Sequence, residues 1–213
     1  MELSFIVPCY NEEGNVELFF EETEKVFHPT GYSYQYIFVN DGSSDLTRQK
    51  LKSLYENHPE SNITVVNFSR NFGKESAIYA GLKNCDGDNI CIIDADLQQR
   101  PEVALKMYEQ LINNPEYDCV CAFQEQRREN KLMSAVKSAF YKIINNVAEI
   151  EFKNGASDFR LFKSKVKDAM LLMPEYHRFS KGIFSWVGFN VLYMAYEAEE
   201  RNAGETKWSP FKI

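Results

Sequence analysis

Two carboxylates, Asp94 and Asp96, follow the apolar run ICII at residues 90–93. If a strand continues through both, their side chains lie on one face, because alternate residues of a strand point the same way. Neighbouring carboxylates repel each other unless a cation lies between them. The spacing therefore indicates a divalent metal site, to which Gln98 on the same face would add a neutral oxygen ligand. The alternative is a solvated turn before Pro101, since aspartate is common in turns.

The elements that would position these acids alternate along the first half of the chain. Apolar, strand-like runs at 3–10, 34–41, 63–69, 89–96 and 117–123 are separated by helical patterns at 12–26, 45–56, 74–84 and 101–113. Continuous apolar strands between helices predict an α/β fold, in which a mostly parallel, Rossmann-like sheet carries helices on both faces.

Polar side chains cluster where three of these strands are expected to end. Tyr10-Asn11-Glu12 follows the first strand, Asn40-Asp41-Gly42-Ser43 follows the second, and Asp94 and Asp96 follow the fourth. The carboxyl ends of parallel strands lie at one edge of a sheet, which is where such proteins bind ligands. Three converging polar ends favour a ligand pocket with a metal ion over three unrelated turns.

The second half of the chain has a looser pattern. Apolar positions between residues 131 and 148 predict a helix, a further helix opens near Ser164, and residues 178–197 are interpreted as a loop followed by a strand. No internal repeat and no linker rich in Gly, Pro or Ser divides the sequence. We therefore expect a single domain over residues 1–213.

The net charge of −7 argues against a nucleic-acid partner, but the charge is unevenly spread. Residues 1–123 carry a net −11 and residues 124–213 a net +4, which suggests a cation as partner of the first half and an anionic group or membrane surface for the second. The five cysteines are odd in number and lie mostly in apolar runs, as expected of reduced cytosolic thiols. No run approaches the ~18–20 apolar residues of a membrane span, and no signal-peptide pattern opens the chain, so we expect it to be soluble.

Phosphates would not be bound here by a glycine-rich turn. Both the dinucleotide fingerprint G-x-G-x-x-G and the Walker A loop are absent from the sequence. A metal ion held by Asp94 and Asp96 would instead bridge a diphosphate and neutralise the charge of a leaving group. This chemistry fits a nucleoside-diphosphate sugar as the substrate.

Seven stretches follow one another along nearly the whole chain: FIVPCYNEEGNV, FVNDGSSD, FSRNFGKESAIYAGL, DADLQQRPE, SDFRLF, RFSKGIFSWVGF and RNAGETKW. In this order they resemble glycosyltransferase family 2, and more narrowly its polyprenyl-phosphate sugar transferases, the bactoprenol glucosyltransferases and dolichyl-phosphate mannose synthases. The resemblance implies a GT-A fold, a nucleotide-sugar donor, Mg²⁺ or Mn²⁺, a polyprenyl-phosphate acceptor and inversion at the sugar carbon. Residues 1–123 would then form the nucleotide-sugar and metal-binding half, and residues 124–213 the acceptor-binding half.

The resemblance also implies roles for individual positions. The positions that match nucleotide-sugar-binding residues are Pro8, Tyr10, Glu12, Phe38, Asn40, Asp41, Asp94, Ala95 and Lys207. The metal and diphosphate group matches Asp94, Asp96 and Gln98. The positions with implied catalytic roles, which include an arginine of a mobile loop and a phosphate-holding arginine, are Asp96, Arg127, Asp158, Arg160 and Arg201.

Two departures from the family pattern bear on the donor. Relatives usually have Asp-Asp-Gly-Ser where this chain begins with Asn40. A carboxylate accepts two hydrogen bonds from guanine, whereas an amide, with one acceptor and one donor group, complements the N–H and carbonyl of uracil. We therefore expect a UDP-sugar rather than GDP-mannose. Gln99-Arg100 replaces the usual Asp-Pro before Pro101, and we expect no effect on the metal.

The acceptor chemistry decides whether a general base is needed. A lipid phosphate has a second pKa near ~6 and is largely dianionic at neutral pH, so its oxygen is already a nucleophile. Basic residues that position it then matter more than a base. Asp158 would serve as a base only for a hydroxyl acceptor, and otherwise orients Arg160, which is the role we favour.

Relatives continue beyond the GETKW stretch with two transmembrane helices, whereas this sequence stops at Ile213. We therefore expect a catalytic domain that is separated from its membrane anchor and works at the cytoplasmic face of a membrane. A homo-oligomer is compatible with the sequence. The alternatives are a family 2 transferase with a saccharide hydroxyl acceptor and a non-catalytic nucleotide-sugar-binding domain. A nucleotidyltransferase lacks its usual glycine-rich loop here, and a phosphoacceptor receiver domain leaves the basic second half unexplained.

Overall fold

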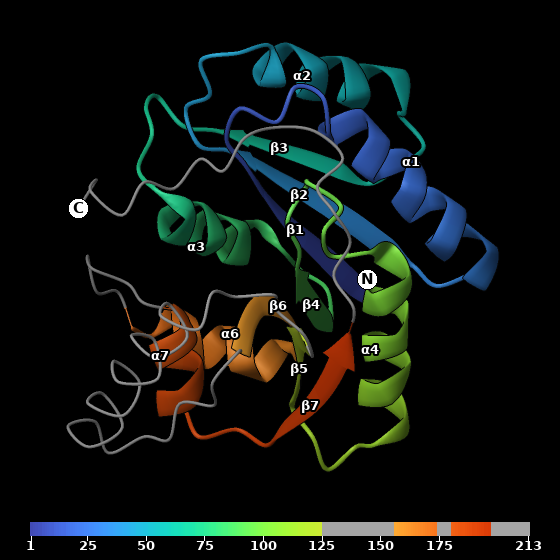
Figure 1. Cartoon of the computed structure of the whole chain (residues 1–213), viewed down its shortest axis with the longest axis vertical. Coiled ribbons are helices and arrows are strands. Elements are labelled where there is room, and N and C mark those ends of the chain that lie inside the picture. The colour runs from blue at the N-terminus through green and yellow to red at the C-terminus, as the bar shows by residue number, and fades with distance from the viewer. Residues whose placement is uncertain (125–155, 174–179, 197–213) are drawn as a thin grey trace, which may run out of the picture.

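The computed structural model describes residues 1–124, 156–173 and 180–196 (Figure 1). In this part of the chain one sheet runs in the order β3-β2-β1-β4-β6-β5-β7. Its strands are β1 Leu3–Cys9, β2 Tyr34–Asn40, β3 Ile63–Asn67, β4 Asn89–Ile92, β5 Cys119–Gln124, β6 Ala156–Lys163 and β7 Val191–Tyr196. Every pairing is parallel except those of β6, which lies antiparallel between β4 and β5. The predicted mostly parallel sheet is confirmed.

Helices cover both faces of this sheet, as predicted (Figure 1). The helices on one face are α1 Val16–Phe27, α2 Thr47–Asn57 and α4 Pro101–Asn113. The helices on the other face are α3 Lys74–Asn84, α6 Ser164–Leu171 and α7 Ser180–Trp186. A short 3₁₀ turn, His28–Thr30, follows α1.

The strands bury side chains on both faces because helices cover both. On β1, Phe5 and Val7 pack with α1 and α4, whereas Ile6 packs with α3. On β6, Phe159 lies in the first core and Phe162 in the second. Residues 158 and 160 of β6 therefore face the α3 side, since alternate residues of a strand share a face.

Helix α3 approaches the sheet unusually closely. A Cβ atom on Gly81 would lie 2.3 Å from the Cγ2 of Ile6, a distance that no side chain tolerates. The missing side chain lets the helix settle onto β1, and Ile78 and Leu82 pack beside it in the same core. This packing fixes the height of α3 above the sheet and hence the position of its first turn.

Several boundaries differ from the sequence-based expectations. Helices α3 and α4 have the predicted bounds, but α1 begins at Val16 rather than Glu12, because residues 12–15 form a turn in which the Asn15 N–H donates to the Glu12 carbonyl (2.9 Å). The expected loop after residue 178 contains α7, whose Phe184 packs on the β6 core. The helix expected at 131–148 lies outside the described residues.

The expectation that Asp94 and Asp96 share a strand face is wrong. Strand β4 ends at Ile92, so both carboxylates lie in the loop that follows it. Leu97 in this loop adopts a left-handed backbone conformation with φ 58°, which turns the chain away from the sheet. The grouping of acids at the site therefore has another origin than strand alternation.

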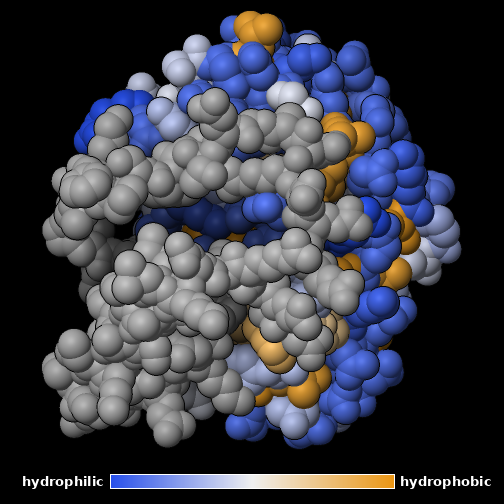
Figure 2. Space-filling model, in the orientation of Figure 1, coloured by the Kyte–Doolittle hydropathy of each residue, from blue (hydrophilic) through white to orange (hydrophobic). Residues whose placement is uncertain are grey.

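The described surface in Figure 2 is mostly hydrophilic, with hydrophobic side chains in small separate patches. None of the helices in the described ranges has the length and apolar character that crossing a bilayer requires.

Candidate active site

The loops that follow β1 and β2 are tied together by hydrogen bonds between backbone N–H groups and side-chain oxygens. The Asn11 N–H donates to Ser43 Oγ (3.0 Å), and the Ser44 N–H donates back to Asn11 Oδ1 (2.9 Å). The Glu12 N–H donates to Thr47 Oγ1 (2.7 Å), at the start of α2. Asn11 has φ 54°, a left-handed conformation that asparagine tolerates better than most residues. These bonds make the two strand ends a single fixed surface.

Asn40, at the end of β2, is buried and held in one orientation. Its Nδ2 donates to Asn67 Oδ1 (2.9 Å), and its Oδ1 accepts from the Ser43 N–H (3.1 Å). A backbone N–H can only donate, so the bond from Ser43 settles which end of the amide is oxygen. One N–H and one lone pair of Asn40 remain for another partner.

Asp41 acts as an anchor for the turn that leads into α3. Its two carboxylate oxygens accept the N–H groups of Phe72 (2.7 Å) and Gly73 (2.9 Å). Burial raises the pKa of Asp41, and these two N–H donors oppose that rise. At the neighbouring Gly42, φ is +63° and a Cβ would lie 2.2 Å from the Arg70 carbonyl carbon, so the turn packs directly on the backbone of Gly42. Asp41 thus positions the first turn of α3.

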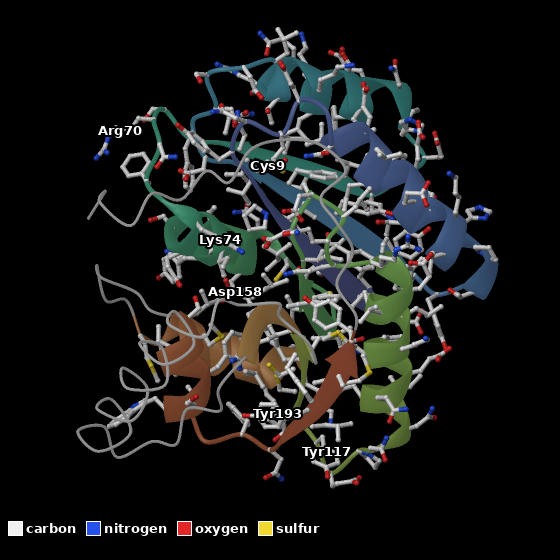
Figure 3. All side chains as sticks on the ribbon, viewed as in Figure 1. Cys9, Arg70, Lys74, Tyr117, Asp158 and Tyr193 are labelled. Atoms are coloured by element: carbon white, nitrogen blue, oxygen red, sulfur yellow. The ribbon has the colours of Figure 1, made fainter. Side chains whose placement is uncertain are left out.

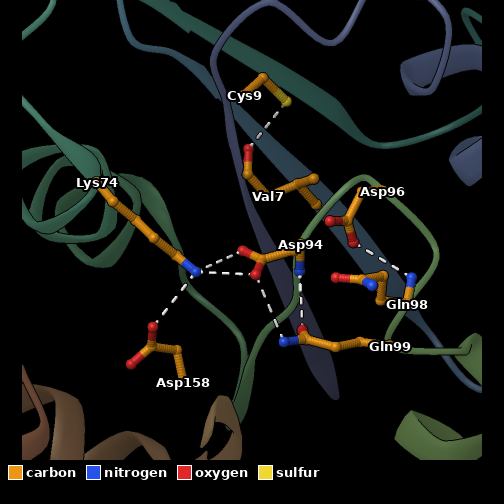
Figure 4. Close-up of polar contacts among 8 residues, drawn as sticks. All are labelled: Val7, Cys9, Lys74, Asp94, Asp96, Gln98, Gln99 and Asp158. Atoms are coloured by element: carbon orange, nitrogen blue, oxygen red, sulfur yellow. Dashed lines mark hydrogen bonds and ion pairs between the residues drawn. The ribbon is translucent and has the colours of Figure 1, made fainter. Parts of the chain in front are cut away.

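The first residue of α3, Lys74, lies between two carboxylates, Asp94 in the loop after β4 and Asp158 on β6 (Figures 3 and 4). Its Nζ lies 2.7 Å from Asp94 Oδ1, 2.9 Å from Asp94 Oδ2 and 3.4 Å from Asp158 Oδ2. Burial alone would lower the pKa of Lys74, but the two carboxylates outweigh burial and raise it. Lys74 is therefore a charged ammonium ion at neutral pH.

The register of the sheet explains why Asp94 and Asp158 meet. Ile92 of β4 pairs with Arg160 of β6 in the antiparallel ladder. Asp94 follows the end of β4 by two residues and Asp158 precedes Arg160 by two, so both acids lie near the same end of this ladder. Neighbouring carboxylates repel each other, and the ammonium of Lys74 compensates both.

The loop after β4 has its own hydrogen bonds (Figure 4). The Asp94 N–H donates to Gln99 Oε1 (3.0 Å), and Gln99 Nε2 lies 3.4 Å from Asp94 Oδ2. The Gln98 N–H donates to Asp96 Oδ1 (3.2 Å). Gln99 is buried, and its side chain contacts both the backbone N–H and the carboxylate of Asp94. The expectation that Gln99-Arg100 does not affect the metal stays a prediction.

The side chains of this loop fit a divalent cation by their chemistry. Asp94, Asp96 and Gln98 offer carboxylate and amide oxygens, which are the ligands that Mg²⁺ and Mn²⁺ prefer. Asp94 already holds a cation, the ammonium of Lys74, with both of its oxygens. Within the described residues, no group of three or more His, Cys, Asp and Glu side chains is arranged to hold a metal ion, so a bound ion would draw on Gln98, water or substrate oxygens.

Residues 4–170 match the family profile described as "Glycosyl transferase family 2". The chain belongs to this family. A putative glycosyltransferase, CsbB, of Bacillus subtilis is 40% identical over 97% of this chain and 62% of the relative. A prophage bactoprenol glucosyl transferase homolog of Escherichia coli is 35% identical over 100% of this chain and 69% of the relative. The chain thus spans about two thirds of the length of these curated relatives, and the resemblance drawn from the seven stretches is confirmed.

Solved structures of the same fold include two with a nucleotide and Mn²⁺. Glucosyl-3-phosphoglycerate synthase from Mycobacterium tuberculosis, in complex with Mn²⁺, UDP and phosphoglyceric acid, superposes with a TM-score of 0.66 at 18% identity, covering 96% of this chain and 72% of that chain. The mannosyltransferase PcManGT from Pyrobaculum calidifontis, in complex with GDP-Man and Mn²⁺, gives 0.65 at 17% identity, covering 94% and 58%. The fold of this family 2 member is the predicted GT-A fold.

The structure brings some of the positions matched to the family together and not others. Pro8, Tyr10 and Glu12 lie at the partly exposed end of β1, and Asp94, Asp96, Gln98 and Asp158 surround the β4 loop. Arg127, Arg201 and Lys207 lie outside the described residues.

Three matched positions have buried side chains. Phe38 is fully buried and its ring stacks on Tyr36, with ring centroids 5.8 Å apart, and Ala95 lies in the same core. The side chains of Phe38 and Ala95 therefore contribute to the hydrophobic core, and their implied roles at a nucleotide stay predictions. Arg160 is also buried, with its guanidinium 4.5 Å from the ring centroid of Phe184 on α7.

The sequence reasoning missed Lys74, the residue that joins the acids of the site. One signal was present, because a lysine at the first residue of a helix opposes the helix dipole and needs an anion nearby. The stretch FGKES places this lysine at the predicted start of the helix at 74–84. Its two partners were not predictable from that signal, because one of them lies on a strand far along the chain.

Proposed function

We propose that the chain is the catalytic domain of an inverting glycosyltransferase that moves a hexose from a nucleotide-diphosphate sugar to a polyprenyl phosphate. The observation that carries this proposal is the charged site formed by Lys74, Asp94 and Asp158 beside the fixed surface at the ends of β1 and β2. Membership of glycosyl transferase family 2 supports the reaction class. Relatives named bactoprenol glucosyl transferase support the lipid acceptor.

The donor end would be divided between a base site and a diphosphate site. Tyr10, Glu12 and Asn40 line the β1 and β2 ends, where the nucleoside would bind. Asp94, Asp96 and Gln98 would hold Mg²⁺ or Mn²⁺, which when bound supplies positive charge to the diphosphate leaving group. The Mn²⁺ in two solved structures of this fold is consistent with that role.

A UDP-sugar is the favoured donor because of how Asn40 is held. Its amide keeps one N–H and one acceptor lone pair after its bonds to Asn67 and Ser43. Uracil offers a carbonyl beside an N–H, which this pair complements, whereas guanine offers two neighbouring donors that an aspartate would accept. Because Asn67 and Ser43 fix the amide, the mismatch with guanine cannot be relieved by rotating it.

The acceptor end would work by positioning rather than by proton removal. A lipid phosphate is largely dianionic at neutral pH, since its second pKa is about 6, so its oxygen can attack the sugar carbon directly. Asp158 then serves to hold Lys74, its partner at 3.4 Å, rather than to act as a base. Catalysis at the cytoplasmic face of a membrane follows from such an acceptor and belongs to the same proposal, as does the single-domain arrangement with donor residues in 1–123 and acceptor residues in 124–213.

A saccharide hydroxyl is the second acceptor to consider, because one observation favours it. Asp158 shares the ammonium of Lys74 with Asp94, at the edge of the proposed donor site, where a general base for a hydroxyl would be needed. The two acceptors are distinguished by the pH dependence of transfer, since a hydroxyl requires an ionised base and a phosphate dianion does not.

The proposal is tested first by nucleotide binding. Melting temperatures are measured with UDP and with GDP, each with and without Mn²⁺, because a ligand that binds only the folded state raises the melting temperature. We expect a rise with UDP that requires Mn²⁺ and a smaller rise with GDP. A larger rise with GDP overturns the donor, and no rise with either nucleotide overturns the proposal. Transfer of labelled glucose from UDP-glucose to polyprenyl phosphate or to free sugars then decides the acceptor.

A further inference from the structure

Lys74 is held in place by contacts on both sides of its own position in the chain. On one side, Gly73 donates its N–H to the buried carboxylate of Asp41 (2.9 Å). On the other side, Glu75 accepts the N–H of Ser180 (3.0 Å) and also its hydroxyl, which ties the first turn of α3 to the start of α7. The ammonium of Lys74 therefore reaches the acids from a braced turn, unlike that of a surface lysine whose position is set by its own rotamers.

The contacts of Lys74 use the oxygens that a metal ion would need. Both carboxylate oxygens of Asp94 lie within 2.9 Å of its Nζ, and the Lys74 side chain is only 23% exposed. A divalent ion that binds Asp94 must take at least one of these oxygens. It would also lie next to a fixed positive charge, and two cations at such a distance repel each other.

Asp158 gives Lys74 a second partner that does not depend on Asp94. It lies on β6, and its Oδ2 is 3.4 Å from Nζ. When a metal ion neutralises Asp94, the ammonium keeps a carboxylate to pair with. Removal of Lys74 would take away the cation that both carboxylates share.

We propose that Lys74 is a positioning residue: an internal counter-cation that joins Asp94 to Asp158 before the donor arrives, and that yields Asp94 to the divalent ion while staying paired with Asp158. This inference deepens the proposed function and rests on it, because it requires the metal to bind at Asp94. Lys74 would link the donor side of the site to the acceptor side, because metal binding at Asp94 would leave Asp158 as the carboxylate that pairs with the Lys74 ammonium.

The experiment compares the chain with Lys74→Met, Lys74→Arg and a matched control, Lys83→Met. Lys83 lies in the last turn of the same helix, where its Nζ is 4.6 Å from the ring centroid of Tyr79. Melting temperatures are measured in EDTA and with Mn²⁺, without nucleotide. Mn²⁺ affinity is measured separately from the electron paramagnetic resonance signal of the free ion.

Removal of Lys74 should have opposite effects on the two measurements. In EDTA we expect Lys74→Met to lower the melting temperature by about 5 °C, because two carboxylates lose their cation. Mn²⁺ should bind Lys74→Met about tenfold more tightly than the parent, since a competing charge has been removed. Lys74→Arg should restore the melting temperature in EDTA, and Lys83→Met should change neither quantity.

The outcomes separate this inference from the proposed function. If the parent binds Mn²⁺ and Lys74→Met binds it equally or more weakly, Lys74 does not compete with the metal and the inference is overturned while the metal site stands. If neither protein binds Mn²⁺, the metal part of the proposed function fails, and the inference fails with it. A merely structural lysine would lower the stability without tightening Mn²⁺ binding.

Discussion

The loops after β1 and β2 and the loop after β4 lie at the same edge of the sheet but are held in different ways. In the first two loops, backbone N–H groups donate to side-chain oxygens, as in the bonds of Asn11 with Ser43 and Ser44 and that of Leu46 with Glu13. In the third, one ammonium ion on Lys74 serves three carboxylate oxygens of Asp94 and Asp158. The hydrogen bonds of the loops after β1 and β2 fix the shape of those loops. In the loop after β4, the Lys74 ammonium compensates carboxylate charge, and a bound metal ion could replace it at Asp94.

The difference matches the two parts of a nucleotide sugar. A base is neutral and is recognised by the positions of its donors and acceptors, so its site gains from rigid, satisfied partners such as the Asn40 amide. A diphosphate arrives with negative charge and a metal ion, so its site needs side chains that can change partners. Substitutions in the loops after β1 and β2 and substitutions in the charged site around Lys74 test whether these two regions have different roles.

The largest effect is expected from Asp96→Asn, which removes one carboxylate of the proposed metal group. Transfer should fall on the order of a thousandfold, the size of losing one electrostatic group at a transition state. The amide oxygen of asparagine can still accept the Gln98 N–H, so the fold should be kept. Transfer rate and the Mn²⁺-dependent UDP shift are the measurements.

The matched control for this change is Asp88→Asn, at the exposed start of the same strand region. It removes the same charge far from the carboxyl ends of the strands and should leave transfer unchanged. Equal losses in both variants would mean that net charge, not the Asp96 site, is what matters.

Gly42→Ala should break the packing between the loop after β2 and the turn that leads into α3. The new Cβ would lie 2.2 Å from the Arg70 carbonyl carbon, at a φ of +63°, so the turn before α3 must move. We expect a loss of about 3 kcal/mol in the free energy of unfolding, since a strained backbone and a steric clash add. Urea denaturation measures it.

Gly31→Ala separates the two causes of that loss. Gly31 has a similar φ of +73° but nothing within 4 Å of the added Cβ. Its substitution should cost only about 1 kcal/mol, the price of a left-handed alanine. If Gly42→Ala costs no more than this control, the close packing of the turn on β2 does not hold the site.

The strand ends of β1 and β2 could be predicted from the sequence, whereas the charged site around Lys74 could not. The polar strand ends were predicted because they follow from local patterns: apolar strands, polar residues such as Asn40 and Asp41 after them, and helices between. The bounds of α3 and α4 were predicted for the same reason, since Gly73 and Pro101 mark where those helices start.

The charged arrangement depends on contacts between residues far apart in the chain. Lys74 pairs with Asp158 only because β6 inserts antiparallel between β4 and β5, and no local pattern in SDFRLF indicates this. The burial of Phe38 and Arg160 also depends on contacts between distant parts of the chain. A match to a family motif does not indicate whether the side chain at that position is buried. Helix α7 was missed because contacts with Glu75 and the β6 core, rather than its seven residues alone, support it.

Gln99→Glu sharpens the comparison by adding charge to the β4 loop without removing a backbone contact. The glutamate can still accept the Asp94 N–H, but its second oxygen replaces the Nε2 that lies 3.4 Å from Asp94 Oδ2. The extra carboxylate should lower the free energy of unfolding in EDTA by about 1–2 kcal/mol and tighten Mn²⁺ binding a few-fold. Gln110→Glu, on the exposed side of α4, is the control. Unchanged Mn²⁺ affinity would show that Gln99 lies outside the electrostatic reach of the metal.

The smallest effect is expected from Asn67→Ala, which removes one of the two hydrogen bonds that hold the buried Asn40 amide. Asn67 Oδ1 is the acceptor for Asn40 Nδ2, and Asn67 itself is exposed, so water can take its place. Stability should fall by about 0.5–1 kcal/mol, the net value of one such hydrogen bond.

The informative measurement on Asn67→Ala is the ratio of the UDP and GDP shifts in melting temperature. In this variant only the Ser43 N–H holds the Asn40 amide, so the amide is oriented less firmly. The preference for UDP should therefore narrow, while the requirement for Mn²⁺ is unchanged. Asn62→Ala, on an exposed asparagine just before the start of β3, should leave the ratio as it is. A ratio that stays constant in Asn67→Ala would mean that the base is selected elsewhere, and that the rigidity of the loops after β1 and β2 serves only to brace α3 and Lys74.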